Sequence, residues 1–322
     1  MEKESRKDIK RISHSPPHFP FEEPPLALSM GLQKVSNSGW FEISDLKERA
    51  LQLEEKKNFL ASIHKDVFMA DASALKASID VLNLMLINLT TYQPDLYSLK
   101  NNIIKLKPHK YFEGEEFLTD LNTNGMHPLD LAARLVQEDL LIMMPPNKKQ
   151  KGWWLAAGSL TFPSRWDLKE KFRKTMDDIH APVPFYKDAL KIPTNNFFDK
   201  MPCDDIFARC NWSLHDTPSL RQNGTKPLIE KTGINSRNAG ERLWLRVERQ
   251  TLRKLKKTGA ILFTIRIYID PLKEIVKFDG VAKRLNKALS VLPPEMQAYK
   301  QNNTFSDSVR KYLDQFRIIM GE

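Results

Sequence analysis

The chain is poor in the residues and patterns that mark several common classes of protein. It has only two cysteines among its 322 residues. They do not form a CxxC pair and no HExxH sequence occurs, so a structural zinc site is not expected. Neither a Gly-x-Gly nor a GxSxG sequence occurs, which argues against a dinucleotide-binding loop and a hydrolase nucleophile elbow. No apolar run is long enough for a membrane span, and none follows the charged N-terminus. These absences predict a cytoplasmic protein with reduced thiols and no membrane segment.

The charge of the chain is strongly positive, with a formal net value of +10. Much of the excess lies in two short lysine-rich clusters, at 148–151 and 253–257. The chain carries no helix-turn-helix, zinc-finger or RNA-binding aromatic signature, so the charge does not by itself indicate nucleic-acid recognition. A surface that docks an acidic protein explains the same charge through electrostatic steering. We therefore expect a protein partner and no nucleic acid.

The two ends of the chain differ from its centre. Residues 1–29 are charged and then proline-rich, which predicts an extended arm, and residues 30–322 are expected to form one domain. Apolar residues at three- and four-residue spacing predict helices at Ile43–Phe68, Ala72–Thr91, Pro128–Gln137, Leu272–Leu289 and Ser306–Met320. The stretch between Tyr92 and Gly125 gives no clear pattern.

The centre of the chain reads as a set of strands. Apolar runs and alternating patterns predict five of them, at Leu140–Met144, Trp153–Phe162, Ile206–His215, Leu243–Leu255 and Ala260–Ile269. The last two are joined by a lysine-rich turn ending in Thr258-Gly259, which is typical of a hairpin. Helical pieces around 167–178 and 195–200 separate the second strand from the third. This order predicts an α+β fold, a PAS-like five-stranded antiparallel sheet with helical decorations at both ends.

His180 is the first candidate for chemistry. It lies in the sequence DDIHAPVP. Pro182 and Pro184 fix φ and remove two backbone donors, so we expect neither an ordinary helix nor a central strand here. A rigid loop fixes the direction of an imidazole, as an axial ligand of haem iron or another metal requires. The alternative is a histidine that only satisfies a nearby carbonyl group.

The predicted hairpin carries hydrogen-bonding side chains on both faces. They are Arg246, Glu248 and Gln250 on one face, Arg249 and Thr251 on the other, and Arg266 and Tyr268 on the next strand. The plain alternative is a solvated outer face. If one face lines a cavity, Arg246 or Arg249 could pair with haem propionates or a substrate anion, and Glu248 could hold a cationic amine. The pattern does not decide which face points inward.

Seven runs of the sequence carry a resemblance to a known family. They are GLQKVSNSGWFEIS (31–44), LVQEDLLIM (135–143), FPSRWDLKEKF (162–172), IHAPVPFY (179–186), NNFFDKM (195–201), NWSL (211–214) and LRVERQTLRKLKKTGAILFTIRIY (245–268). In order and spacing, from about Gly31 to Leu272, the chain resembles the haem-dependent oxidative N-demethylase alpha-subunit-like family. The segments IHAPVP and RVERQTLRKL are specific in combination.

The resemblance implies a PAS-like domain that binds haem b. The activity it implies uses O₂ to demethylate a small secondary amine such as dimethylamine, giving a primary amine and formaldehyde. Electrons would come from a reductase partner that carries flavin and an iron–sulfur centre. This chain has no flavin or nicotinamide sequence and too few cysteines for such a cluster.

The resemblance also suggests roles for particular residues. His180 is the expected axial ligand of the haem iron, and the expected cofactor-binding residues are Arg246, Arg249, Arg165, Asn211 and Trp212. Glu248 and Thr251 are candidates for proton delivery, with Arg266 or Arg249 holding the acid or the propionates. Two alternatives stay open, since fold does not fix function. One is a haem-binding PAS-like sensor or regulatory subunit without turnover, and the other is a cofactor-free subunit that scaffolds a reductase complex.

Overall fold

The central feature of the fold is an antiparallel sheet. The structure is a computed structural model that describes residues 18–21, 30–120, 125–224, 233–300 and 305–319. Within these ranges seven strands pair in the spatial order β1 (Gln33–Val35), β8 (Ile206–His215), β9 (Trp244–Lys254), β10 (Ile261–Pro271), β6 (Asp139–Met144), β7 (Trp154–Ser159) and β2 (Phe68–Ala70). A second, three-stranded sheet contains β3 (Tyr97–Lys100), β4 (Ile103–Leu106) and β5 (Glu115–Leu118). The chain therefore has the mixed α+β fold that the sequence predicts.

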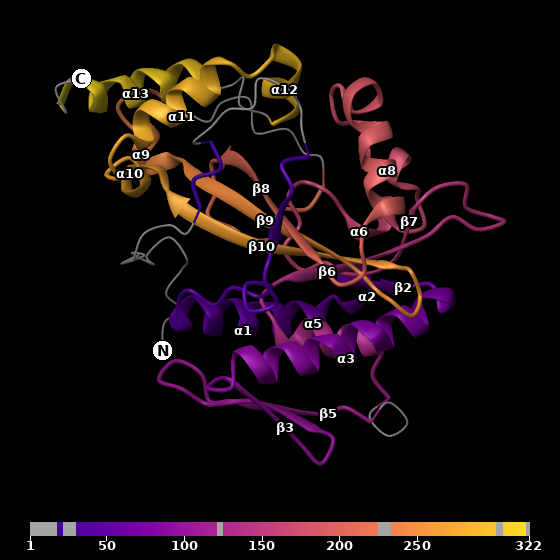
Figure 1. Cartoon of the computed structure of the whole chain (residues 1–322). Coiled ribbons are helices and arrows are strands. Elements are labelled where there is room, and N and C mark those ends of the chain that lie inside the picture. The colour runs from indigo at the N-terminus through magenta and orange to yellow at the C-terminus, as the bar shows by residue number, and fades with distance from the viewer. Residues whose placement is uncertain (1–17, 22–29, 121–124, 225–232, 301–304, 320–322) are drawn as a thin grey trace.

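Helices cover both sides of the main sheet (Figure 1). On one side lie α1 (Leu46–Ser62), α3 (Leu75–Tyr92) and α5 (Pro128–Leu135). On the other side lie α6 (Leu168–Lys171), α7 (Met176–His180) and α8 (Lys191–Lys200). The remaining α-helices are the single turn α2 (His64–Val67) and, toward the C-terminus, α9 (Ala239–Arg242), α10 (Leu272–Ile275), α11 (Val281–Ser290), α12 (Pro294–Tyr299) and α13 (Ser306–Ile319).

The five predicted strands are all present and adjacent, as β8-β9-β10-β6-β7. The expected five-stranded PAS-like sheet is nevertheless wrong in strand number, because β1 and β2 extend it at its two edges. Each edge strand has three residues, which is too short for an alternating pattern to stand out in the sequence. The stretch 92–125, which shows no clear pattern, supplies β3, β4 and β5.

Three predicted helical boundaries need correction. The expected helix Ile43–Phe68 is interrupted at Ile63, where φ is −133° and ψ is 37°, outside the helical region. The expected helix Leu272–Leu289 is divided into α10 and α11, with Gly280 in the left-handed region at φ +63°. The segment around His180 contains one helical turn after all. The prolines lie beyond its end, where they cannot interrupt it.

The described residues form three apolar clusters, which lie on both faces of the sheet. Leu140, Ile142 and Leu262 pack in one cluster with α3, whereas Ile265 and Ile267 pack in another beneath α6–α8. This division follows from the strand pairing, since successive residues of a strand point to opposite faces.

Helix α3 with its preceding turn, Ala72–Tyr92, is long and apolar enough to cross a membrane by length and composition. Its side chains Val81, Met85 and Leu89 are completely buried within the core. A core helix of this kind meets the same criteria as a membrane span, so the segment is only weak evidence for one.

Part of the predicted N-terminal arm lies against the sheet, and the rest, residues 1–17 and 22–29, is outside the described residues. His18 pairs through Nε2 with Oε2 of Glu42 at 2.8 Å, and the hydroxyl of Tyr268 donates to the same oxygen at 2.8 Å. Phe21 is 1% exposed and meets the ring of Trp212 edge-on at 5.5 Å between centroids. Phe21 therefore belongs to the core, and residues 18–20 are partly buried beside it.

We expect the His18 contact to make stability depend on pH. Burial lowers the pKa of His18, but hydrogen bonds with Cys210 and Glu42 outweigh burial and raise it from 6.5 to about 9. Because the folded pKa is the higher one, the stabilising effect is complete below about pH 6.5 and is lost between there and about pH 9. The thermal stability of the parent should therefore fall more steeply over that pH range than the thermal stability of His18→Gln. Stability curves that run parallel against pH for the two proteins would contradict the assignment of the pH dependence to His18. Arg249 and Tyr268, the other charged or titratable neighbours of Glu42, are present in both proteins and so do not account for a difference.

Candidate functional site

His180 ends helix α7 on the face of the sheet covered by α6–α8. The helix begins with a capping box, in which Thr175 and Asp178 each accept a hydrogen bond from the other's backbone N–H. Its first residue, Met176, is anchored by a backbone hydrogen bond to Trp153 O at 2.6 Å. The short helix thus positions His180 from the edge of strand β7.

The ring of His180 is held in one orientation and one tautomer. Its Nδ1 lies 2.8 Å from the carbonyl oxygen of Met176, and because a carbonyl only accepts, Nδ1 carries the proton. The ring of Tyr186 stacks on the imidazole at 4.9 Å with an interplanar angle of 18°. No hydrogen bond from the described part of the chain reaches Nε2.

Burial lowers the pKa of His180, and the positive charges of Lys171 and Arg209 lower it further, against the opposing influence of the hydrogen bond to Met176. The imidazole is therefore neutral near pH 7, with a lone pair on Nε2. A neutral ring with Nδ1–H bonded to a carbonyl is the arrangement in which histidine ligates a metal.

Glu248 lies on the same face of the sheet, on strand β9. Its Oε1 is 3.5 Å from Nε of Arg246, a contact too poorly aligned to count as a hydrogen bond, and Gln250 donates to its Oε2 at 3.1 Å. The side chain of Glu248 is 15% exposed, whereas that of Arg246 is completely buried. The carboxylate is therefore partly shielded from water and held from two sides.

Cations surround Glu248. Four cationic side chains are under the influence of its charge: Lys171, Arg209, Arg246 and Lys300. For each cation, burial is the largest influence and lowers the pKa, while the negative charge of Glu248 raises the pKa. The balance leaves the pKa of Lys171 at about 8 and that of Lys300 at about 8. The cations come from α6, β8, β9 and the residue after α12, so the cluster exists only in the folded chain.

Two arginines on this face, Arg246 and Arg165, keep donors without an acceptor. Arg246 donates to the carbonyl oxygens of Leu220 and Phe162, but its Nε has no hydrogen-bond partner. Arg165 donates from Nη1 to Lys300 O at 3.2 Å, while its buried Nη2 has no partner within the described ranges. Arg165 and Arg246 act on one another electrostatically. Buried N–H groups without acceptors are costly, and an anion beside Arg165 would supply the acceptor that its Nη2 lacks.

The backbone of the same region is strained. Arg165, Arg173 and Phe185 have φ values of +62°, +64° and +62°, in the left-handed region that favours glycine. Such strain costs about 1–3 kcal/mol per residue and clusters at functional sites. All three residues lie in the segment that builds the wall around His180, which supports a functional reading of that wall.

The structure divides the sequence-predicted residues between the two faces of the sheet. Strand register places Glu248, Arg246 and Asn211 on the face of His180, and Arg165 lies above that face. Arg249, Thr251, Arg266 and Trp212 point to the opposite face. The structure therefore does not bring together all the residues that the sequence analysis expected in one haem site, because four of them lie on the other face.

The residues on the opposite face have buried partners of their own. Arg249 donates to the carbonyl oxygen of Trp40 at 3.0 Å and pairs with Glu42 at 2.9 Å. Arg266 donates to Gln52, and the hydroxyls of Thr251 and Thr264 lie 2.6 Å apart. These contacts tie the sheet to the N-terminal segment and to α1, which is a structural role.

Asn211 and Trp212 meet the cluster at the edge of strand β8. The ammonium group of Lys300 lies 3.4 Å from Oδ1 of Asn211 and donates to the carbonyl oxygen of Trp212. It also lies 4.9 Å from the centre of the Trp212 ring. Both residues thus hold Lys300 in place, and Trp212 does so although its ring belongs to the opposite face.

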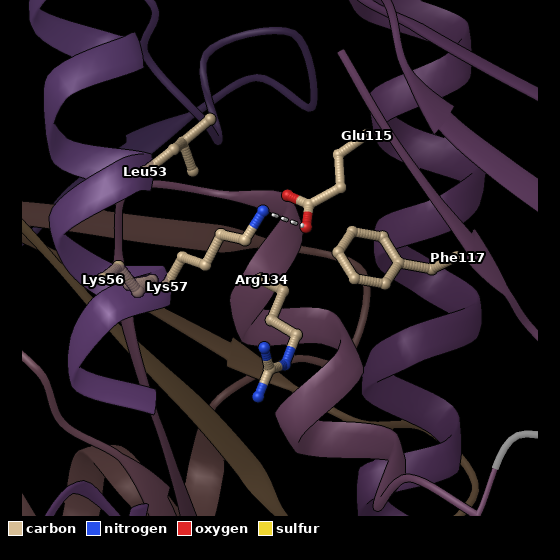
Figure 2. Close-up of a pocket in the computed structure, with 6 residues that line it drawn as sticks. All are labelled: Leu53, Lys56, Lys57, Glu115, Phe117 and Arg134. Atoms are coloured by element: carbon tan, nitrogen blue, oxygen red, sulfur yellow. Dashed lines mark ion pairs between the residues drawn. The ribbon is translucent and has the colours of Figure 1, made fainter. Parts of the chain in front are cut away.

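Two other kinds of site find less support. Among the described residues no group of three or more His, Cys, Asp or Glu side chains could hold a bare metal ion. A shallow pocket on the α1 side, shown in Figure 2, encloses about 200 Å³ of space, part of it open to solvent. Its lining residues are Leu53, Lys56, Lys57, Glu115, Phe117 and Arg134. Lys57 and Glu115 already pair across it at 3.1 Å, and the pocket is smaller than usual for a cofactor.

A sheet face that combines a neutral histidine with an open ring nitrogen and unpaired buried guanidinium groups is the kind of site that holds an anionic metal cofactor. The family model of the haem-dependent oxidative N-demethylase, alpha subunit-like, matches residues 31–310. The chain belongs to this family. The resemblance carried by the seven sequence runs is thereby confirmed, and the family's description indicates haem dependence and the presence of other subunits.

Sequence reasoning did not single out Lys171, Arg209 or Lys300. Arg209 could have been found, because it alternates with Asn211 on a predicted strand. Lys171 belongs to the run FPSRWDLKEKF, but its proximity to Glu248 depends on how α6 folds over the sheet. Lys300 gives no local signal, since it reaches the site from far along the chain.

The hydroxyl pair on the opposite face provides a test of its structural role. Thr251→Val leaves the buried hydroxyl of Thr264 unpaired and should lower the free energy of unfolding by about 1–3 kcal/mol. Replacing both threonines with valine removes the unpaired group and should recover most of that loss. Denaturant unfolding of both single variants and the double variant measures this. A double variant that loses more free energy of unfolding than the two single variants together would refute the pairing. Loss of activity in Thr251→Val without loss of stability would instead indicate a role in catalysis.

Proposed function

We propose that this chain is the haem-binding subunit of an oxidative N-demethylase, which removes a methyl group from a small secondary amine with O₂ and electrons from a reductase. The observation that carries the proposal is His180, whose Nδ1–H is committed to a backbone carbonyl while Nε2 is left without a hydrogen bond in the described chain. Family membership supports the same conclusion.

The residues on this face fit a haem. His180 would ligate the iron through Nε2. Arg165, whose buried Nη2 lacks an acceptor, would bind a propionate, and the charge of Arg246, which acts on Arg165, would favour an anion there. The two cysteines are seven positions apart and form no CxxCH sequence, so covalent attachment is not expected and the cofactor is haem b.

The reaction balances as an oxygenation. Dimethylamine, for example, reacts with O₂, two electrons and two protons to give methylamine, formaldehyde and water. Haem supplies the oxygen activation when it is bound. The protein residues bind and orient the amine, exclude water and supply protons.

Glu248 is the acid of the proposed site. Its carboxylate can accept a hydrogen bond from a protonated amine, and in its protonated form it can pass a proton to a reduced oxygen atom. Arg246 and Gln250 hold its two oxygens. Thr251, Arg249 and Arg266 have no part in these steps, since they lie on the opposite face.

The electrons come from a separate reductase subunit or protein with flavin and an iron–sulfur centre. Amine-dependent oxygen consumption with such a reductase distinguishes a demethylase from a haem-binding sensor, which would use the same site without turnover. Formaldehyde release in the same assay gives a second readout.

Replacing His180 tests the ligand assignment. His180→Gly should lower haem affinity at least about tenfold and shift or abolish the Soret band, because the axial ligand is lost. Added imidazole should restore the parent spectrum in this variant, and His64→Gln, a substitution at a surface histidine of α2, should behave like the parent. An unchanged spectrum in His180→Gly would move the ligand elsewhere. Absence of haem in the parent would refute the proposed function.

Arg165 offers a matched test of propionate binding. Arg165→Gln removes a charged donor worth about 1.5–3 kcal/mol, so haem affinity should fall at least about tenfold. Arg173→Gln is the control, because Arg173 has the same backbone conformation but is exposed and pairs with Asp71 at 2.7 Å. Titration of the apoprotein with haem gives both affinities. Equal losses in the two variants would show that backbone strain, and not the guanidinium charge, is responsible.

A further inference from the structure

The face that carries His180 has a surplus of positive charge. In the described chain, five buried or partly buried cationic side chains act on Glu248 or on one another: Lys171, Arg209, Arg246, Lys300 and Arg165. The carboxylates that act on these cations are Glu248, Asp216, Asp139 and Glu170.

Two of the four carboxylates contribute little to the balance. Asp139 accepts hydrogen bonds from Thr161 and Phe162, and its charge also acts on two further cations, Lys56 and Arg221, which offset it. Glu170 is exposed, so water screens its charge. Glu248 and Asp216 are left to oppose the five cations, which gives a surplus of three positive charges. The two propionates of a haem would reduce that surplus without removing it.

Two of these cations have no partner that neutralises them directly. The side chains of Arg209 and Lys171 make no hydrogen bond or ion pair with any described residue. The polar contact of Lys171 is with the face of Trp166, 4.1 Å from the ring centre. Both act electrostatically on His180 and on Glu248, and strand register places Arg209 on the same face of the sheet as Glu248.

A simple alkylamine is a poor match for such a place. Dimethylamine is a cation at neutral pH, and a cation entering a partly buried site of net positive charge is repelled. Glu248 alone would have to offset its own cationic neighbours before it could bind the amine. A ligand that brings a carboxylate together with its amine meets unpaired cations and the acid at once.

We infer that the substrate is a methylated amine that also carries a carboxylate, that is, an N-methyl amino acid, with Arg209 and Lys171 receiving the carboxylate and Glu248 the amine. The inference rests on the proposed function. The chemistry is unchanged: the N–methyl group is oxidised by O₂ and two electrons, and an amino acid, formaldehyde and water leave.

Calorimetric titration of the haem-loaded chain tests this with three probes. N-methylglycine has both groups, its methyl ester lacks the carboxylate charge, and dimethylamine lacks the carboxylate altogether. We expect N-methylglycine to bind at least about tenfold more tightly than either of the others, and to perturb the Soret band on binding. Equal affinities, tighter binding of dimethylamine, or no measurable binding of N-methylglycine would overturn the inference.

Variants connect the preference to the named residues. Arg209→Gln should remove the tenfold advantage of N-methylglycine over its ester, whereas Lys256→Gln, at the exposed β9–β10 turn, should keep it. Lys171→Met is a second variant on a different element and should act in the same way if Arg209→Gln does not fold. A preference that survives in both site variants would overturn the inference. The haem spectrum of the parent is recorded first, so failure of the proposed function, seen as no haem or no dependence on His180, is distinguished from failure of the substrate class.

Discussion

The structure depends on strand β9, which is paired along its length with β8 on one side and with β10 on the other. This double pairing forces alternate side chains of β9 onto opposite faces, and both faces are covered by helices. Arginines are consequently buried on both sides of one strand, Arg246 on one and Arg249 on the other. A buried guanidinium group needs acceptors, so the surrounding loops and helices must supply them.

The two faces meet this need differently. On the face toward α1, Arg249 finds two carbonyl oxygens and Glu42, while Arg266 finds Gln52 and Glu48. These arginines act as cross-links between the sheet and the N-terminal part of the chain. Buried donors without acceptors nevertheless remain on both faces, on Arg246 and Arg165 toward α7 and on Arg266 toward α1. The α7 face differs in carrying His180, whose Nε2 has no hydrogen bond in the described chain, and ligand binding is proposed there for that reason.

Helix α7 determines both the position and the orientation of His180 in the proposed site. Its capping box and its anchor on Trp153 place His180 over the polar face, and the Met176 carbonyl selects the tautomer. The same segment contains the strained residues Arg173 and Phe185 at its borders. The backbone contacts of Thr175 and Met176 with Trp154 and Trp153 hold the N-terminal end of this short helix, so the geometry of the histidine depends on the sheet.

Local patterns in the sequence were enough to predict the five central strands, the α+β class, the family and the interest of His180, because alternation and motif order are local properties. They also pointed to Arg246, Glu248 and Arg165, which the structure brings to one face. The folded chain was needed to show that Arg249, Thr251 and Arg266 lie on the other face, that β1 and β2 complete the sheet, and that Lys171, Arg209 and Lys300 surround Glu248. These facts depend on which face each helix covers and on contacts between distant segments, and an alternating pattern that is polar on both sides gives no information about either.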